Sequence, residues 1–160
     1  MKGVRDSKKL TPRKREGWYE RLDGMRKAGQ LNFATASSSA ETIDARGIVP
    51  SIFSALEECL KLLNANPETC EILLDGSLHA PAQFARQKTI IHGDDIEPVI
   101  SAASIVAKVE RDRLMMQLSP QFPGYSFETH KGYGTSAHCS AIRTHGLCAL
   151  HRKSFCTRLV

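Results

Sequence analysis

The sequence predicts one α/β domain. Two short apolar runs of strand length, residues 71–74 and 88–92, lie between segments whose apolar residues recur at helical spacing. No internal repeat and no linker interrupts this alternation, which is typical of strands covered by helices. The chain has 160 residues. A domain of that size buries roughly two-thirds of the surface that its unfolded chain exposes, so its core needs no disulfide or metal.

Two helices are expected before the first strand. Thr11 and Pro12 are typical of an N-cap followed by a first-turn proline, and the helical pattern that they open ends at Gly29. The second helix covers residues 48–63, with one apolar stripe, and ends at Asn64. Between these helices, residues 31–36 are expected to be extended and to run into a serine cap for a short turn of helix.

Both strands are expected to finish on aspartate. Residues 71–74 run into Asp75, and residues 88–92 run into Gly93 and Asp94. Pro98 then begins a long helix that continues to about Leu118. Its predicted core stripe consists of Ile100, Ala103, Ile105, Val106 and Val109. A loop rich in glycine and aromatic residues follows at residues 123–134, and Thr135 caps a last helix that ends near Gly146.

The charge of the chain favours a polyanionic partner. The formal net charge is +5, and basic residues cluster at residues 8–15 and 151–158. Such clusters attract nucleic acid, although they also occur as solvated faces of a merely basic protein. The five cysteines include no C-x-x-C pair, which argues against a disulfide framework and a zinc knuckle. With no signal-peptide pattern and no stretch of about eighteen apolar residues, we expect a cytoplasmic protein with no membrane partner.

Asp75 and Asp94 are the candidate catalytic and metal-binding residues. Carboxylates at the ends of adjacent strands lie on a rigid edge, where their oxygens can converge on Mg²⁺ or Mn²⁺. Divalent cations held in this way activate water and stabilise the leaving oxygen in phosphodiester cleavage. Two other interpretations remain open: Asp75-Gly76 is also a common turn dipeptide, and Asp94 is also suited to cap the helix that Pro98 begins.

Seven ordered motifs identify the chain as similar to the ribonuclease HII family. The resemblance spans nearly the whole chain, and each motif alone would be weak. The motifs are D-S-K-K-L at residues 6–10, L-D-G at 74–76, G-D at 93–94, S-A-A-S-I with A-K-V at 101–109, R-D at 111–112, H-K-G-Y-G-T at 130–135 and H-R-K-S-F at 151–155.

The resemblance implies a fold and an activity. The fold is a ribonuclease H-like mixed sheet flanked by helices, here lacking the N-terminal strands, with a C-terminal helical part in a single domain over residues 1–160. The activity is cleavage of the RNA strand of RNA–DNA hybrids, and of DNA duplexes 5′ to an embedded ribonucleotide, during DNA replication and repair. The family holds divalent metal, Mn²⁺ or Mg²⁺, with four carboxylates, two of which match Asp75 and Asp94.

The resemblance also implies residues that contact nucleic acid. Lys8 and Lys9 match residues that neutralise backbone phosphates, and Tyr133 matches a tyrosine that stacks on the sugar at the RNA–DNA junction. The remaining nucleic-acid-binding candidates are Lys131, Arg152 and Ser154. As isolated residues, the lysines would indicate a solvated turn and Tyr133 a packing residue. Asp112 lies four residues after Lys108, so this pair is expected to form an ion pair on one helix face that supports the metal site. The four histidines at 130, 138, 145 and 151 show no zinc spacing, and His138 and His145 are expected to share a helix face.

The resemblance leaves two functional interpretations open. Relatives carry an Asp-Glu pair and a Gly-Arg-Gly loop before the D-S-K-K-L motif, whereas only five residues precede that motif here. One interpretation is a monomeric enzyme whose site is completed by upstream residues or by a complementing N-terminal segment. The other is a catalytically incomplete fragment that at most binds RNA–DNA hybrids.

Overall fold

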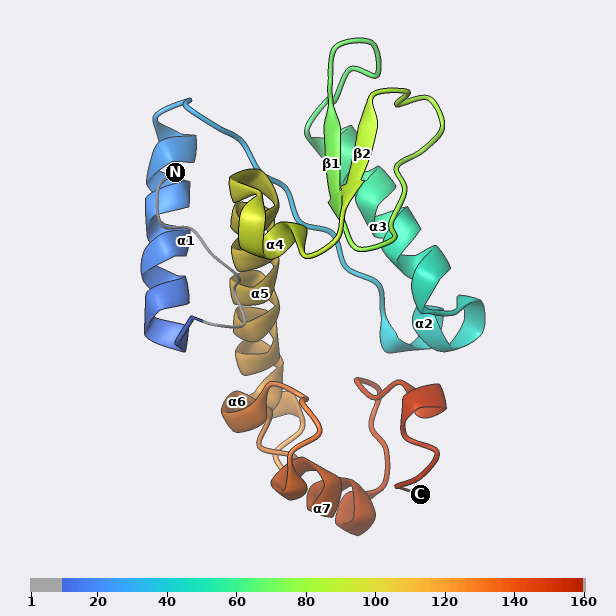
Figure 1. The fold of residues 1–160 in the computed structure, drawn as a ribbon. Helices are drawn as coiled ribbons and strands as arrows, with labels where there is room; N and C mark the ends of the chain where they lie inside the picture. Colours follow the sequence, from blue (N-terminus) through green and yellow to red (C-terminus); the bar gives the residue numbers. More distant parts are fainter. Residues whose placement is uncertain (1–9, 160) are drawn as a thin grey trace. The chain divides into compact units, whose positions relative to one another are not determined.

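The computed structural model describes residues 10–159 and forms two compact units (Figure 1). Unit 1 contains the chain up to residue 36 together with residues 52–109, and unit 2 contains residues 37–51 and the chain from residue 110 onward. Lys8 and Lys9 lie outside the described residues. That both units belong to one domain stays a prediction. No helix within residues 10–159 has the length and apolarity that a membrane crossing needs.

Unit 1 begins with α1 (Pro12–Lys27), which starts where the sequence predicts. The hydroxyl of Thr11 accepts a hydrogen bond from the backbone N–H of Lys14, so the predicted cap is present. Trp18 and Tyr19 of this helix pack against Ile105 and Val109, which belong to the long helix α5 (Pro98–Leu118). Figure 1 shows α1 running beside α5. This packing forms an apolar cluster in unit 1.

The core stripe of α5 was predicted correctly except at one position. Ile100, Ile105, Val106 and Val109 are buried, as expected, but Ala103 is exposed and Ser101 is buried in its place. The reason is the side on which α5 is buried. Residue 103 is two positions from both 101 and 105, and two residues rotate about 200° around the helix axis. Ala103 therefore faces away from the side on which Ser101 and Ile105 lie.

The sheet of the described chain consists of β1 (Ile72–Asp75) and β2 (Gln87–Ile90), which are parallel. Helix α3 (Ile48–Leu62) contributes Leu60 to the cluster that contains Leu74 of β1 and Phe84 of the connecting loop. The α/β class is confirmed, whereas the larger mixed sheet implied by the resemblance stays a prediction. Residues 31–36, expected to be extended, are irregular and pair with neither strand.

The end of the second strand differs from the prediction. β2 ends at Ile90, because His92 adopts a left-handed conformation with φ of 56° and Gly93 begins the short helix α4 (Gly93–Ile96). Asp94 therefore lies in the first turn of a helix and does not close a strand. Only Asp75 occupies the strand end that the sequence predicts for both aspartates.

Unit 2 is helical. Its helices are α2 (Ala40–Arg46), η1 (Ser119–Gln121), α6 (Phe127–His130), α7 (Ser136–His145) and η2 (Lys153–Phe155), together with the end of α5. The core contains Tyr125 and Phe127, whose rings stack at 5.3 Å, and Ile142 of α7. Thr135 caps α7 through the N–H of His138, as predicted. The region expected to be an irregular loop, residues 123–134, contains α6.

Candidate active site and nucleic-acid interface

The two candidate catalytic aspartates are linked through Gly93. The Oδ1 atom of Asp75, at the end of β1, accepts a hydrogen bond of 2.8 Å from the backbone N–H of Gly93. Asp94 follows Gly93 directly and is 8% exposed. The structure therefore brings the Asp75 carboxylate to the turn that carries Asp94. Their metal-binding role stays a prediction.

Gly93 has no room for a side chain. A Cβ atom at this position would lie 2.6 Å from Cδ1 of Ile100 and 3.5 Å from Oδ1 of Asp75. Carbon atoms in contact are normally about 3.5–4.0 Å apart, so any larger residue would displace Ile100 or the turn itself. The absence of a side chain at residue 93 lets the backbone N–H reach the aspartate at the end of β1.

Ser101 also holds the turn that carries Asp94, through a hydrogen bond of its side chain. Its side chain is buried, and its hydroxyl oxygen lies 2.6 Å from the carbonyl oxygen of Asp94 and 3.0 Å from that of Glu97. A buried hydroxyl requires such partners, because an unsatisfied one would destabilise the fold. From the sequence, Ser101 was placed only within the S-A-A-S-I motif and was assigned no role of its own. The pattern that could have revealed its role is a serine spaced four residues before Ile105 in an otherwise apolar stripe.

The donor set suits a hard divalent cation. Carboxylate oxygens are the ligands that Mg²⁺ and Mn²⁺ prefer, and Asp75 and Asp94 supply them at one turn. Within residues 10–159, no group of three or more histidine, cysteine, aspartate or glutamate side chains is arranged to hold a metal ion. That Asp75 and Asp94 share a cation stays a prediction.

The loop that follows α6 displays Tyr133. Its ring is half exposed, and the guanidinium of Arg111 lies 5.1 Å from the ring centroid, within cation–π range. Arg111 also donates a hydrogen bond of 2.8 Å to the carbonyl of Lys131. The ammonium of Lys131 donates to the carbonyl of Glu128 in α6. The proposed sugar-stacking residue is thus supported from α5.

The C-terminal turn at η2 is fixed by Asp44 of α2. The backbone N–H groups of Lys153 and Ser154 donate to its carboxylate at 2.7 and 3.0 Å, and the Ser154 hydroxyl donates as well. The Ser154 hydroxyl bond, with the two backbone N–H groups, holds the pKa of Asp44 below its usual value. The guanidinium of Arg152 lies 4.0 Å from the Phe155 ring centroid. Nucleic-acid contact by Ser154 stays a prediction, and its hydroxyl proton is already committed to Asp44.

Asp112 and Lys108 lie on the same helix, α5, as predicted. A carboxylate oxygen of Asp112 lies 3.8 Å from a guanidinium nitrogen of its neighbour Arg111. An exposed contact of this length contributes little to stability. The predicted ion pair between Asp112 and Lys108 stays a prediction.

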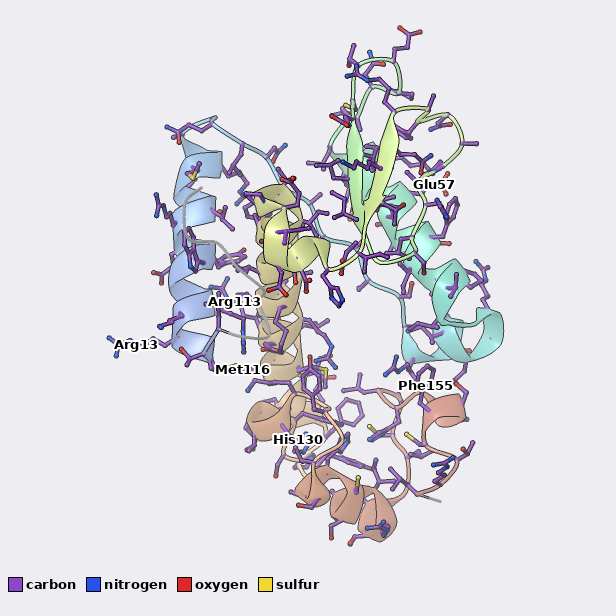
Figure 2. The ribbon with its side chains drawn as sticks, in the orientation of Figure 1. Arg13, Glu57, Arg113, Met116, His130 and Phe155 are labelled. Carbon is purple, nitrogen blue, oxygen red and sulfur yellow. The ribbon has the colours of Figure 1, made fainter. Side chains whose placement is uncertain are left out.

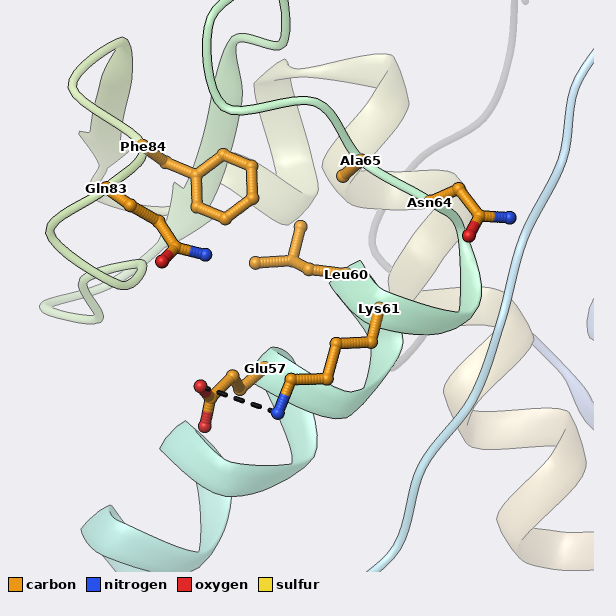
Figure 3. A pocket seen from close by; sticks show the side chains of 7 residues that line it. All are labelled: Glu57, Leu60, Lys61, Asn64, Ala65, Gln83 and Phe84. Carbon is orange, nitrogen blue, oxygen red and sulfur yellow. Dashed lines mark ion pairs between the residues drawn. The ribbon is translucent and has the colours of Figure 1, made fainter.

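A separate hollow in unit 1 does not coincide with these residues. Figure 3 shows it between α3 and the loop that joins the strands, with a salt bridge of 3.6 Å between Glu57 and Lys61 at its rim. The other lining residues are Leu60, Asn64, Ala65, Gln83 and Phe84. None of the candidate site residues lines this hollow, so we place no catalytic function there.

The structure adds a histidine pairing in unit 2 that the sequence did not predict. His138 and His145 both lie on α7, but His138 is paired with His151, at 3.0 Å between their Nε2 atoms. The ring of His145 packs instead on Tyr125, with centroids 5.8 Å apart. Sequence reasoning missed the pairing because residues 138 and 151 lie on different segments, and no spacing rule connects them.

Known proteins resemble this chain over almost all of its length. A ribonuclease HII from Polaromonas sp. strain JS666 is 40% identical over 155 residues, which is 97% of this chain and 74% of that protein. A ribonuclease HII from Verminephrobacter eiseniae is 40% identical over 96% of this chain and 70% of its own length. A ribonuclease HII from Coxiella burnetii is 41% identical over 97% of this chain and 73% of its own.

A family model described as ribonuclease HII matches residues 1–158. That range contains all the motifs that carry the resemblance, including both aspartates of the described site and the loop that carries Tyr133. The match and the three relatives agree on one assignment. This chain belongs to the ribonuclease HII family and is, by that membership, an enzyme of the hydrolase class.

Proposed function

We propose that this chain cleaves the RNA strand of RNA–DNA hybrids, and nicks duplex DNA 5′ to an embedded ribonucleotide, by metal-assisted hydrolysis. One observation carries the proposal within this fold. The Asp75 carboxylate at the end of β1 is bonded to the N–H of Gly93, next to the largely buried Asp94. The proximity of the Asp75 carboxylate to the turn that carries Asp94 supports a cation site for both residues, and such a cation would offset the charge of the approaching phosphate backbone.

Asp75 and Asp94 are the residues that would hold Mg²⁺ or Mn²⁺. When bound, the cation would supply stabilisation of the charge that develops on the phosphodiester oxygens and activation of a water molecule. Gly93 and Ser101 keep the turn in place, so that the two carboxylates do not have to reorganise when substrate binds. Tyr133 would stack on the sugar at the RNA–DNA junction, where the 2′-hydroxyl distinguishes RNA from DNA.

The experiment uses a DNA duplex with one internal ribonucleotide, incubated with the chain and Mn²⁺. A nick 5′ to the ribonucleotide is expected, and an all-DNA duplex of the same sequence should stay intact. Asp75→Asn and Asp94→Asn should each lower the rate by roughly 10³-fold, the equivalent of about 4 kcal/mol of lost charge stabilisation. Asp95→Asn, which makes the same charge change one residue away, serves as the control. Full activity in either test variant would remove that aspartate from the site.

A second candidate function is hybrid binding without cleavage. It is favoured by the described site itself, which within residues 10–159 brings together no set of three or more potential ligands. Tight binding of the hybrid with no nick at any Mn²⁺ or Mg²⁺ concentration would select this candidate. If an added N-terminal segment of a relative restores nicking, the first candidate function, cleavage, is supported instead.

We also propose a cellular compartment and an oligomeric state for this chain. The five cysteines are free thiols, which fits a reducing compartment, and we propose the cytoplasm. We further propose that the chain acts as a monomer on nucleic acid, with a complementing N-terminal segment as the alternative. Size-exclusion chromatography with light scattering distinguishes a species of 17.7 kDa from a larger one.

A further inference from the structure

Three histidines form a buried cluster in unit 2 beside the loop that carries Tyr133. His130 ends α6 and is labelled in Figure 2, His138 lies in the first turn of α7, and His151 precedes η2. Their exposed fractions are 7%, 5% and 7%. The ring centroids are 4.4 Å apart between His130 and His138, and 5.2 Å apart between His138 and His151. Burial of three imidazoles in contact is costly unless they stay neutral and hydrogen-bonded.

Hydrogen bonds fix the tautomers of two of these rings. The backbone N–H of Cys148 donates to Nδ1 of His151 at 2.9 Å, so the proton of His151 is on Nε2. Nδ1 of His138 lies 3.0 Å from the carbonyl of Tyr133, which can only accept, so His138 carries its proton there. The Nε2 atom of His138 is then free of a proton and accepts from Nε2 of His151 at 3.0 Å.

The third ring holds the same loop at another point. Nε2 of His130 lies 2.8 Å from the carbonyl of Tyr125 and must donate to it. Nδ1 of His130 then accepts from the backbone N–H of Gly132 at 3.2 Å. All six ring nitrogens are therefore used, and each ring is neutral. We call these three residues, His130, His138 and His151, the histidine relay.

The backbone that the relay holds is in a conformation that needs support. Lys131 and Gly132 both have positive φ angles, 53° and 77°, and a left-handed conformation is unfavourable for a non-glycine residue such as Lys131. The relay bonds the N–H of Gly132 and the carbonyl of Tyr133, and Arg111 bonds the carbonyl of Lys131. Three consecutive residues are thus tied to neighbouring side chains, while the Tyr133 ring remains half exposed.

We propose that the histidine relay positions Tyr133 for nucleic acid, by holding the loop at residues 131–133 through the hydrogen bonds that the three neutral imidazoles make. The inference rests on the proposed function, in which Tyr133 stacks on the sugar of the substrate. A proton added to Nε2 of His138 or Nδ1 of His151 replaces an acceptor by a donor, and the facing N–H group then has no partner. When His138 becomes charged, its hydrogen bond with His151 is lost; when His151 becomes charged, its hydrogen bond with the N–H of Cys148 is lost.

The surroundings of the relay favour the neutral rings. Burial lowers the pKa of His138 and of His151 below the usual histidine value, and each ring opposes a charge on its neighbour. Other titratable or charged residues near the relay include Tyr125, Glu128, Lys131, Cys139, His145, Cys148 and Arg152. Burial raises the pKa of the Tyr125 hydroxyl and of the Cys148 thiol, so both stay uncharged. The Ser119 hydroxyl keeps the pKa of Glu128 low, and Glu128 is the anion beside His130.

The first test observes the relay in the wild-type chain and does not depend on substrate. Long-range ¹⁵N–¹H NMR spectra at pH 7.5 should show a proton on Nε2 of His130, on Nδ1 of His138 and on Nε2 of His151. The amide of Gly132 should exchange slowly, and roughly tenfold faster in His130→Ala, which removes its acceptor. A charged ring at pH 7.5, or a different tautomer at His138 or His151, would overturn the relay.

The second test measures hybrid binding by fluorescence anisotropy in the absence of Mn²⁺ and Mg²⁺. His138→Ala should raise the Kd roughly tenfold, the effect of one lost hydrogen bond of typical strength. His138→Asn keeps a donor near the position of Nδ1 and should stay within about threefold of wild type. His79→Gln, at an exposed histidine of unit 1, is the matched control. A purely structural defect would lower the fraction of binding-competent protein and leave Kd unchanged.

The third test asks whether the relay acts on hybrid binding through Tyr133. In the Tyr133→Ala background, His138→Ala should raise the Kd no further, because the residue that it positions is gone. Additive effects of the two substitutions would show that His138 acts elsewhere and would overturn the proposal. If the wild-type chain binds no hybrid, the proposed function fails together with the role of the relay. If it binds and His138→Ala binds equally well, the relay alone is refuted.

Discussion

Replacement of Gly93 by alanine tests whether the turn at the candidate active site depends on the missing side chain. The added methyl group would lie 2.6 Å from Cδ1 of Ile100, which is 7% exposed and has little space to move. Overpacking of this kind costs about 1–3 kcal/mol. The gain from a less flexible unfolded chain is about 0.4–1 kcal/mol. With the middle of each range, Gly93→Ala should therefore lower the free energy of unfolding by about 1.3 kcal/mol.

Urea denaturation followed by the fluorescence of Trp18 measures this loss, because Trp18 is the single tryptophan and packs within unit 1. Gly24→Ala is the matched control. Gly24 lies inside α1, and a methyl group added there would meet nothing within 4 Å, so alanine should stabilise by about 0.4–1 kcal/mol. If alanine lowers the free energy of unfolding at residue 93 and raises it at residue 24, the loss at residue 93 comes from the contact with Ile100.

A double-mutant cycle locates the clash. Ile100→Val removes the Cδ1 atom and should cost about 0.5–1.5 kcal/mol alone, but with Gly93→Ala it makes room for the new methyl group. The double variant should therefore be more stable than the sum of the single effects by about 1 kcal/mol. Equal urea midpoints for wild type and Gly93→Ala, or strictly additive losses in the cycle, would refute the reasoning.

Three further outcomes are expected. Phe127→Ala should destabilise unit 2 by about 3–5 kcal/mol in near-ultraviolet circular dichroism melts, because Phe127 is 1% exposed; a loss below about 1 kcal/mol would contradict its place in the core. Asp44→Ala should speed the hydrogen exchange of the Lys153 and Ser154 amides, and unchanged protection would show that the carboxylate does not hold η2. The lowered pKa values of His138 and His151 mean that the unfolded chain binds protons first as pH falls. Unit 2 should therefore keep its full stability above about pH 6.5 and lose at most about 1.4 kcal/mol per pH unit for each proton down to the folded pKa, and a flat profile from pH 7.5 to 5.5 would contradict this.

The family and the helix boundaries could be predicted from the sequence, because both depend on residues that are close together in the chain. Thr11 caps α1, Pro98 begins α5 and Thr135 caps α7, as predicted, since a cap requires only residues three or four positions away. Asp75 closes β1 for a similar reason, because a short apolar run followed by Asp-Gly ends a strand. The family motifs are likewise strings of adjacent residues, which can be identified without knowledge of the fold.

Contacts between distant segments were decided by the tertiary structure alone. Gly93 meets Asp75 across 18 residues, Asp44 meets Ser154 across 110, and His138 meets His151 across 13. A strand that ends two residues early moved Asp94 onto a helix, and the direction in which α5 packs buried Ser101 in place of Ala103. Periodicity and caps act within a few residues of the chain, whereas these pairings depend on which surfaces the folded elements bury against each other.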